Sequence, residues 1–229
     1  MLQQTQVERV VPKFKAFIER FPTIEALADS QIKDVLILWQ GLGYNRRAKH
    51  VHQAAQSLRG KQFPRTREEL QKLPGIGPYT SGAICAFAYN QPVLFLETNI
   101  RAVFIHHFFQ KKRIVTDSMI LPVLASCMQY VKDRRTWYAA LMDYGSHLKR
   151  TEGNATRRSA TYAKQSTFRG SRRELRGSIM RLLVQKSELS TERIISLHPL
   201  RDKEEILSVL EDLVSEGMIT KTRDNYNLK

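Results

Sequence analysis

The 229-residue sequence has few cysteines, few acidic side chains and no long apolar runs. Its two cysteines, Cys85 and Cys127, lie in apolar surroundings, which is typical of small buried side chains in a reducing compartment. Two thiols also exclude a four-cysteine zinc or iron–sulfur site. The longest apolar runs, at residues 93–96 and 102–105, are far shorter than the roughly 20 residues that span a membrane.

A secretory signal is also missing, because the sequence M-L-Q-Q-T-Q is polar from its third residue. We therefore expect a cytoplasmic protein, associated with the nucleoid if the source is a prokaryote, and no membrane partner. Acidic residues number only 22 against 37 lysines and arginines, which leaves a net charge of +15. Such an excess of positive charge says little about fold, but it makes nucleic acid the leading candidate for a partner.

Alternation of apolar and polar residues, the mark of exposed strands, is weak before residue 215. Apolar residues instead recur at helical spacing, for example over residues 6–20 and 46–58. The stretch T-R-E-E at residues 66–69 is close to a capping box and predicts the start of another helix. We therefore predict an all-α fold with short connections for the first 150 residues.

The C-terminal tail has a different pattern. Residues 174–217 predict three helices, and the last residues alternate around a turn at Asp224 and Asn225, which is a hairpin signal. Three helices followed by a hairpin indicate a winged-helix-like module, a relative of the helix-turn-helix that binds DNA or another protein. The alternative is a plain helical cap on the main domain.

The octapeptide L-P-G-I-G-P-Y-T at residues 73–80 is the most informative motif. Two glycines before a helix let backbone N–H groups approach a phosphate closely, and the proline suits the first helical position. This pattern predicts a helix-hairpin-helix that grips a DNA backbone without regard to sequence. The alternative is a tight turn between packed helices. The DNA-contacting residues expected here are Leu73, Gly75, Ile76, Gly77 and Thr80.

Four further motifs join this one. They are Glu97-Thr98-Asn99 about 20 residues downstream, M-L-Q-Q-T-Q-V at the start, G-L-G-Y at 41–44, and W-Y-A-A-L-M-D-Y-G at 137–145. Over residues 1 to about 150 the chain thus resembles the helix-hairpin-helix (HhH-GPD) DNA glycosylases, and in particular the MutY-type adenine DNA glycosylases. The resemblance implies a two-lobed helical fold that flips a base out of duplex DNA.

The resemblance also implies roles for individual residues. In that family the first motif lies at the lesion, where a glutamine wedges into the base stack, and the G-L-G-Y loop approaches the opposite base. The residues implied to contact DNA in this way are Gln3, Gln4, Thr5, Leu42, Gly43, Tyr44 and, beside the acidic residue, Asn99.

Two positions are implied to be catalytic. Tyr79 stands where the endonuclease III branch has a lysine nucleophile, and a phenol cannot form a Schiff base, so we expect base excision without strand cleavage. Glu97 is the only acidic residue between Glu69 and Asp117 and stands where the family has an aspartate. A carboxylate there stabilises the positive charge that builds on the sugar. The alternative is a carboxylate that favours a helix N-terminus.

The chain departs from the family in two other ways. The four-cysteine iron–sulfur loop expected after Gly145 is replaced by H-L-K-R-T-E-G-N-A-T-R-R-S, so we expect no cofactor and no metal, with basic residues in the DNA-facing role of the loop. The family's general acid, a glutamate just before M-L-Q-Q-T-Q, is not in this chain. Either the sequence starts inside the motif or the leaving-group acid is lacking, and a lacking acid is expected to lower activity by about 100- to 10,000-fold.

We predict four parts. Residues 1–95 form a six-helix barrel lobe with the helix-hairpin-helix, its N-terminal part truncated; residues 96–150 form a second helical lobe. Residues 151–173 form a basic linker, and residues 174–229 form the winged-helix-like module with a small terminal β-hairpin.

The predicted function is that of a monomeric, monofunctional DNA glycosylase of base excision repair. It would remove adenine opposite 8-oxoguanine or guanine from double-stranded DNA. The alternatives are a glycosylase for thymine or uracil opposite guanine, and a DNA-binding relative without catalytic activity.

Overall fold

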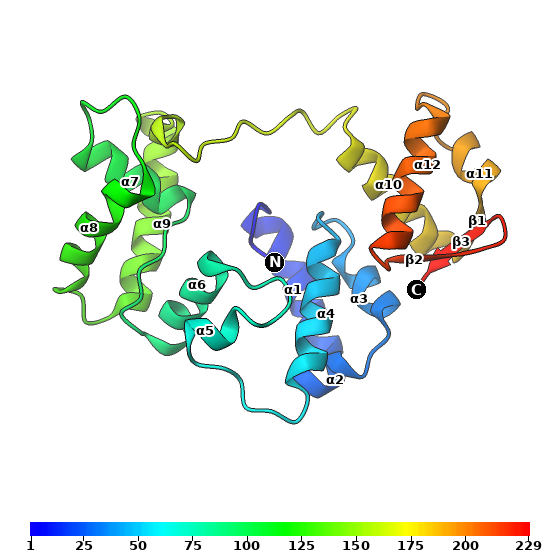
Figure 1. Cartoon of the computed structure of the whole chain (residues 1–229), viewed down its shortest axis with the longest axis horizontal. Coiled ribbons are helices and arrows are strands. Elements are labelled where there is room, and N and C mark those ends of the chain that lie inside the picture. Colours follow the sequence, from blue (N-terminus) through cyan, green and yellow to red (C-terminus); the bar gives the residue numbers. More distant parts are fainter. The chain divides into compact units, whose positions relative to one another are not determined.

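The computed structural model describes residues 1–229, and the chain divides into two compact units. Unit 1 combines Met1–Gln62 with Ser166–Lys229, and unit 2 is Phe63–Gln165. The elements are helical apart from one small sheet near the C-terminus (Figure 1). The predicted all-α class with a terminal hairpin is confirmed. None of the helices has the length and apolar character that crossing a membrane requires.

The N-terminal part of unit 1 contains four helices. They are α1 (Val7–Arg20), α2 (Ile24–Ala28), α3 (Ile32–Trp39) and α4 (Arg46–Leu58). The hydroxyl of Thr23 accepts a hydrogen bond from the amide of Ala26 at 3.0 Å and so caps the start of α2.

The C-terminal part of unit 1 has the order of a winged helix. Its elements are α10 (Arg172–Lys186), β1 (Glu188–Ser190), α11 (Thr191–Ser196), α12 (Lys203–Ser215), β2 (Ile219–Thr222) and β3 (Asn225–Leu228). The strands form an antiparallel sheet in the order β1-β3-β2. The three-residue β1 is too short to show alternation and was not predicted.

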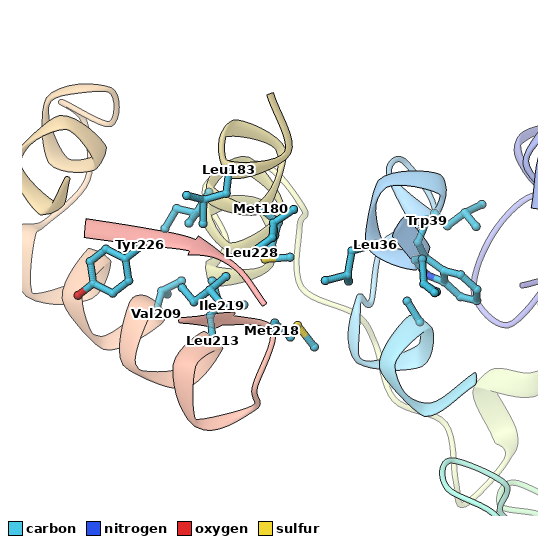
Figure 2. Packing of buried hydrophobic residues seen from close by; sticks show 14 of the residues in the cluster. Leu36, Trp39, Met180, Leu183, Val209, Leu213, Met218, Ile219, Tyr226 and Leu228 are labelled. Atoms are coloured by element: carbon cyan, nitrogen blue, oxygen red, sulfur yellow. The ribbon is translucent and has the colours of Figure 1, made fainter. Parts of the chain in front are cut away.

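Both parts of unit 1 share a single hydrophobic core. Leu36 and Trp39 of α3 belong to the same buried cluster as Met180, Leu213 and side chains of the sheet, which Figure 2 shows at close range. The C-terminal tail therefore packs against the N-terminal helices and does not form a separate core of its own.

Unit 2 contains five helices and a short 3-10 helix. They are α5 (Arg67–Leu70), α6 (Pro78–Tyr89), α7 (Thr98–Phe108), α8 (Asp117–Met128), α9 (Arg134–Thr151) and η1 (Ala155–Arg158). Their core surrounds α7, whose residues Ile100, Phe104 and Ile105 are buried. The predicted cap at Thr66 is present, because its hydroxyl oxygen accepts from the amide of Glu69 at 3.3 Å. The same hydroxyl donates to the Glu69 carboxylate at 2.9 Å, where a full capping box uses the backbone amide of the N-cap residue.

The division after Gln62 differs from the predicted boundary at residue 95. The hairpin helix α6 packs with the later helices of unit 2: Phe87 faces Tyr138 of α9, with ring centroids 6.5 Å apart. The hydroxyl of Tyr138 donates to the carbonyl of Val93 at 2.8 Å. These contacts place the helix-hairpin-helix and Glu97 in one unit.

Candidate active site and DNA-binding surface

The hairpin of residues 73–77 joins α5 to α6 in unit 2. The amide of Ile76 donates to the carbonyl of Leu73 at 3.2 Å, and Gly75 has a φ of +75°, in the left-handed region that favours glycine. Gly77 is the N-cap of α6 and offers no side chain to its first turn. No side-chain cap occupies the first-turn amides of α6, and Thr80 lies in that turn. Helix N-terminal amides without a side-chain cap are a common binding site for phosphate.

The space around Gly77 is open. Gly77 is exposed, and a Cβ atom built on it would meet no atom within 4 Å. Its φ is −94°, which any residue adopts. The absence of a side chain at this position is therefore not needed for folding, and it leaves room for a ligand.

Glu97 is the N-cap of α7. One carboxylate oxygen, Oε1, accepts hydrogen bonds from the amides of Asn99 at 2.6 Å and Ile100 at 2.9 Å. The capping alternative considered for Glu97 is thus realised, and it leaves the second oxygen, Oε2, for another role. Capping fixes the position of the carboxylate against the backbone, which a catalytic group also needs.

The pKa of the Glu97 carboxyl is raised. Burial is the main cause, and it outweighs the two amide hydrogen bonds and the positive charges of Lys149 and Arg101, which act in the opposite direction. The pKa of the Tyr79 phenol is also raised, first by burial and then by the negative charge of Glu97. The two predicted catalytic residues therefore share one electrostatic environment.

Lys149 of α9 was not predicted as a site residue. Its ammonium donates to Oδ1 of Asn99 at 2.7 Å, and burial lowers its pKa while Glu97 raises it. It lies one helical turn after Gly145, so both face the start of α7. Lys149 lies four residues after Gly145, the last residue of the W-Y-A-A-L-M-D-Y-G motif, and this helical spacing could have identified it.

A pocket of about 290 Å³ adjoins Tyr79. Arg101 and Asp117 form part of its wall and are joined by two hydrogen bonds of 2.7 and 2.6 Å. Glu97 does not line this pocket. Its lining residues are Arg67, Pro78, Tyr79, Leu94, Phe95, Leu96, Arg101, Asp117 and Leu121.

In unit 1 the start of the chain and the G-L-G-Y loop lie against each other. The hydroxyl of Thr5 donates to the carbonyl of Leu42 at 3.1 Å. Gln3, Gln4 and Tyr44 are exposed, whereas the side chain of Leu42 is only 4% exposed. The expected DNA contact of Leu42 is thus restricted to its backbone, because the side chain packs in the core.

Arg47 joins these two segments and was not predicted as a site residue. Its guanidinium donates to the carbonyls of Gln3 at 2.6 Å, Leu42 at 3.1 Å and Gly43 at 3.2 Å. Its Cζ also lies 5.5 Å from the centroid of the Tyr44 ring. One side chain therefore holds the two motifs together.

The stretch of residues 147–159, where the resemblance leads one to expect an iron–sulfur loop, is anchored by Arg158. Its guanidinium donates to the carbonyls of Phe109 at 2.8 Å, Gln110 at 2.9 Å and Ile105 at 3.3 Å, at the end of α7. This differs from the DNA-facing role expected for the basic residues, because Arg158 is used internally; Arg157 is exposed. No group of three or more histidine, cysteine or acidic side chains with metal-binding geometry is present.

Known DNA repair proteins are similar to this chain in sequence. Residues 1–121 match the model of the HhH-GPD superfamily base excision DNA repair protein. An adenine DNA glycosylase of Mycolicibacterium smegmatis is 31% identical in an alignment that covers 98% of this chain and 83% of that protein. The adenine DNA glycosylase of Buchnera aphidicola (subspecies Baizongia pistaciae) is 45% identical over 111 residues, which is 47% of this chain and 32% of that protein.

The human adenine DNA glycosylase is 38% identical over 107 residues, or 45% of this chain and 20% of that protein. The chain therefore spans about a third or less of several of the relatives that it matches. Among solved structures, a trapped endonuclease III–DNA covalent intermediate has a TM-score of 0.50 at 18% identity. It covers 65% of this chain and 69% of that one, which supports the fold.

Proposed function

The chain belongs to the HhH-GPD superfamily of base excision DNA repair proteins, and from this premise we propose that it is a monofunctional adenine DNA glycosylase. Its substrate is adenine opposite 8-oxoguanine or guanine in double-stranded DNA. The observation that carries the proposal is the half-buried carboxylate of Glu97, fixed at the start of α7 in the same electrostatic environment as Tyr79.

The proposed chemistry is hydrolysis of an N-glycosidic bond. As the bond to the base breaks, positive charge builds on the anomeric carbon, and the ionised Glu97 stabilises that charge. Lys149 holds Asn99 and, through its charge, favours the ionised form of Glu97. Tyr79 lacks an amine, so no covalent imine forms and the product is an abasic site.

The hairpin of unit 2 and the loops of unit 1 supply DNA binding in this proposal. The outward amides at Gly75 and Gly77 hold one phosphate, while the exposed Gln3, Gln4 and Tyr44 meet the bases at the lesion. The net charge of +15 supports a steep dependence of binding on salt. We further propose a monomer in a reducing compartment, without a cofactor, and iron analysis of the pure protein tests the last point.

The proposal predicts release of free adenine with an intact, abasic strand. Base release is measured in single-turnover reactions. The duplexes carry adenine opposite 8-oxoguanine or guanine, or thymine or uracil opposite guanine. Borohydride is expected to trap little or no covalent complex. The protein is assayed as it stands and with an N-terminal extension that carries a glutamate two residues before Met1.

The outcomes separate the alternatives. Release of thymine or uracil in place of adenine would identify a mismatch glycosylase of the other class. Binding without release of any base, even with the added glutamate, would favour a DNA-binding relative without catalytic activity. Strand cleavage with a trapped imine would contradict the assigned role of Tyr79.

The phosphate grip gives a separate prediction. Gly77→Ala is expected to weaken binding to all duplexes about tenfold, since the Cβ obstructs a charge-assisted hydrogen bond to phosphate. Thermal stability is expected to stay the same, because the new Cβ meets no atom within 4 Å. Fluorescence anisotropy at several salt concentrations measures the change.

Gly177→Ala is the matched control, because Gly177 of α10 is also free of neighbours within 4 Å. We expect this control to bind DNA like the parent. Equal affinity of the Gly77→Ala protein and the parent would place the phosphate contact elsewhere.

A further inference from the structure

We infer that the C-terminal winged-helix module positions the G-L-G-Y loop, that Arg173 is the positioning residue for Tyr44, and that the module thereby sets discrimination between 8-oxoguanine and guanine in the opposite strand. The inference rests on the proposed function. It assigns to residues 172–228 a role other than direct reading of DNA.

The two segments meet at the hydroxyl of Tyr44. Nη1 of Arg173, the second residue of α10, donates to that hydroxyl at 3.1 Å. Nη2 of the same guanidinium donates to the carbonyl of Ser166 at 2.8 Å, which fixes its orientation. The contact joins residues 129 positions apart in the sequence, so it exists only because the module is folded against the N-terminal helices.

Tyr44 itself has an unusual backbone. Its φ of +51° lies in the left-handed region, which a bulky residue adopts only when its surroundings hold it there. Arg47 faces the ring and Arg173 bonds the hydroxyl, so the side chain is held at two places. At 43% exposure it still presents surface to a ligand.

The module is fixed to α4, the helix that follows the loop. The carboxylate of Glu216, whose side chain is 15% exposed, accepts from Arg46 and from Arg176, each at 2.6 Å. Lys49 donates to the backbone carbonyl of Glu216. Two residues further, Met218 belongs to the same buried cluster as Leu36 (Figure 2). The module is therefore anchored to the helix that follows the loop.

The third helix of the module is poorly suited to DNA. In three-helix relatives of the helix-turn-helix, such as the homeodomain, the third helix lies in the major groove, next to phosphates. Here α12 carries Glu204, Glu205, Glu211 and Asp212, and phosphates repel such a row of carboxylates. Asp212 is also bound to Arg172 at 2.6 Å. The module is consequently a support for the loop rather than a second reader of sequence.

The experiment measures binding without catalysis. The probe is a duplex with a tetrahydrofuran abasic analogue opposite either 8-oxoguanine or guanine, and the readout is the ratio of the two dissociation constants. Arg173→Met is expected to reduce that ratio about fivefold, which corresponds to one lost hydrogen bond. Tyr44→Phe, which removes only the hydroxyl, is expected to reduce it equally.

Two further variants make the result specific. The double variant Arg173→Met/Tyr44→Phe is expected to match each single variant, because both remove the same interaction. Arg181→Met is the matched control, since Arg181 is an exposed residue of α10 that takes no part in the contacts described above. It lowers the positive charge equally and should leave the ratio unchanged.

The inference is overturned by an unchanged ratio in the Arg173→Met protein, by a ratio of one in the parent, or by an equal loss in the Arg181→Met control. Additive effects in the double variant would also contradict it. Failure of the proposed function gives a different result, namely no base release by a parent protein whose binding still discriminates. Circular dichroism and thermal melting confirm that each variant is folded.

Discussion

Glu97→Gln is expected to lower single-turnover base release by at least about 100-fold, while binding to the duplex persists or tightens. The substitution removes the negative charge that stabilises the developing charge on the sugar. It keeps the side-chain length and a carbonyl oxygen that still accepts from the amides of Asn99 and Ile100. The measurement is release of adenine opposite 8-oxoguanine by a protein that carries the added N-terminal glutamate.

The control for this variant is Glu152→Gln, which removes an exposed carboxylate at the end of α9 in the same unit. It should release base at the parent rate. Both variants should melt within a few degrees of the parent, because the cap at α7 is retained. Undiminished release by the Glu97→Gln protein would mean that the catalytic carboxylate lies elsewhere.

The pH dependence of base release follows from the same residue. Catalysis needs Glu97 ionised, and burial raises its pKa above the ordinary value of 4.5. As the pH falls, activity is therefore lost at a higher pH than an exposed glutamate would give. In Glu97→Asp the shorter side chain keeps the charge and still caps the helix. Activity should therefore remain, and it should still be lost as the pH falls.

The local structure was largely predictable from the sequence. Helix α4 has the predicted bounds, Arg46–Leu58, because its apolar spacing and the glycines around it are strong local signals. The cap at Thr66 follows from four adjacent residues. The strand β1 was missed because three residues carry no period. Local rules thus identified the elements, and the resemblance placed Tyr79 and Glu97.

The contacts between distant segments were not predictable in this way. Arg47 bonds the carbonyl of Gln3, 44 positions away, and nothing in its immediate neighbourhood distinguishes it from Arg46. The same holds for Arg173 and Tyr44, which only the folded module brings together. Long flexible basic side chains have many reachable partners, and only the packed core selects one of them.

The two compact units differ from the predicted parts for a related reason. Residues 151–173 are basic and polar, which distinguishes them from the helices before them, but this composition does not show what the tail packs against. The core of unit 1 draws on both ends of the chain, so the tail shares a cluster with α3 instead of forming a separate part. Helix α6 likewise joins the later helices, which puts the hairpin and Glu97 into one unit.

Gly145 shows how the W-Y-A-A-L-M-D-Y-G motif supports the site through helix packing. A Cβ atom built on this glycine would lie 2.1 Å from the carbonyl oxygen of Asn99 and 2.9 Å from its Cα. Helix α9 can therefore approach the start of α7 only where a side chain is absent. This close approach also lets Lys149, one turn further, reach the side chain of Asn99.

Gly145→Ala is expected to destabilise unit 2 by about 3 kcal/mol or more, because the overlap is with backbone and cannot be relieved by a rotamer change. That corresponds to a melting temperature lower by about 10 °C. Gly177→Ala, at a position in α10 where a Cβ atom would meet no atom within 4 Å, should not lower the melting temperature. Differential scanning calorimetry of the two variants measures the contrast.

Gly145→Ala and Glu97→Gln should therefore fail in different ways. In the first, α9 must shift away from α7, so the Lys149–Asn99 hydrogen bond of 2.7 Å lengthens and the carboxylate of Glu97 loses its fixed surroundings. Stability and base release should fall together, and cooling should recover part of the activity by restoring the folded population. In the second, base release falls at unchanged stability, so cooling recovers nothing. A Gly145→Ala protein that melts with the parent would show that α9 and α7 do not approach this closely.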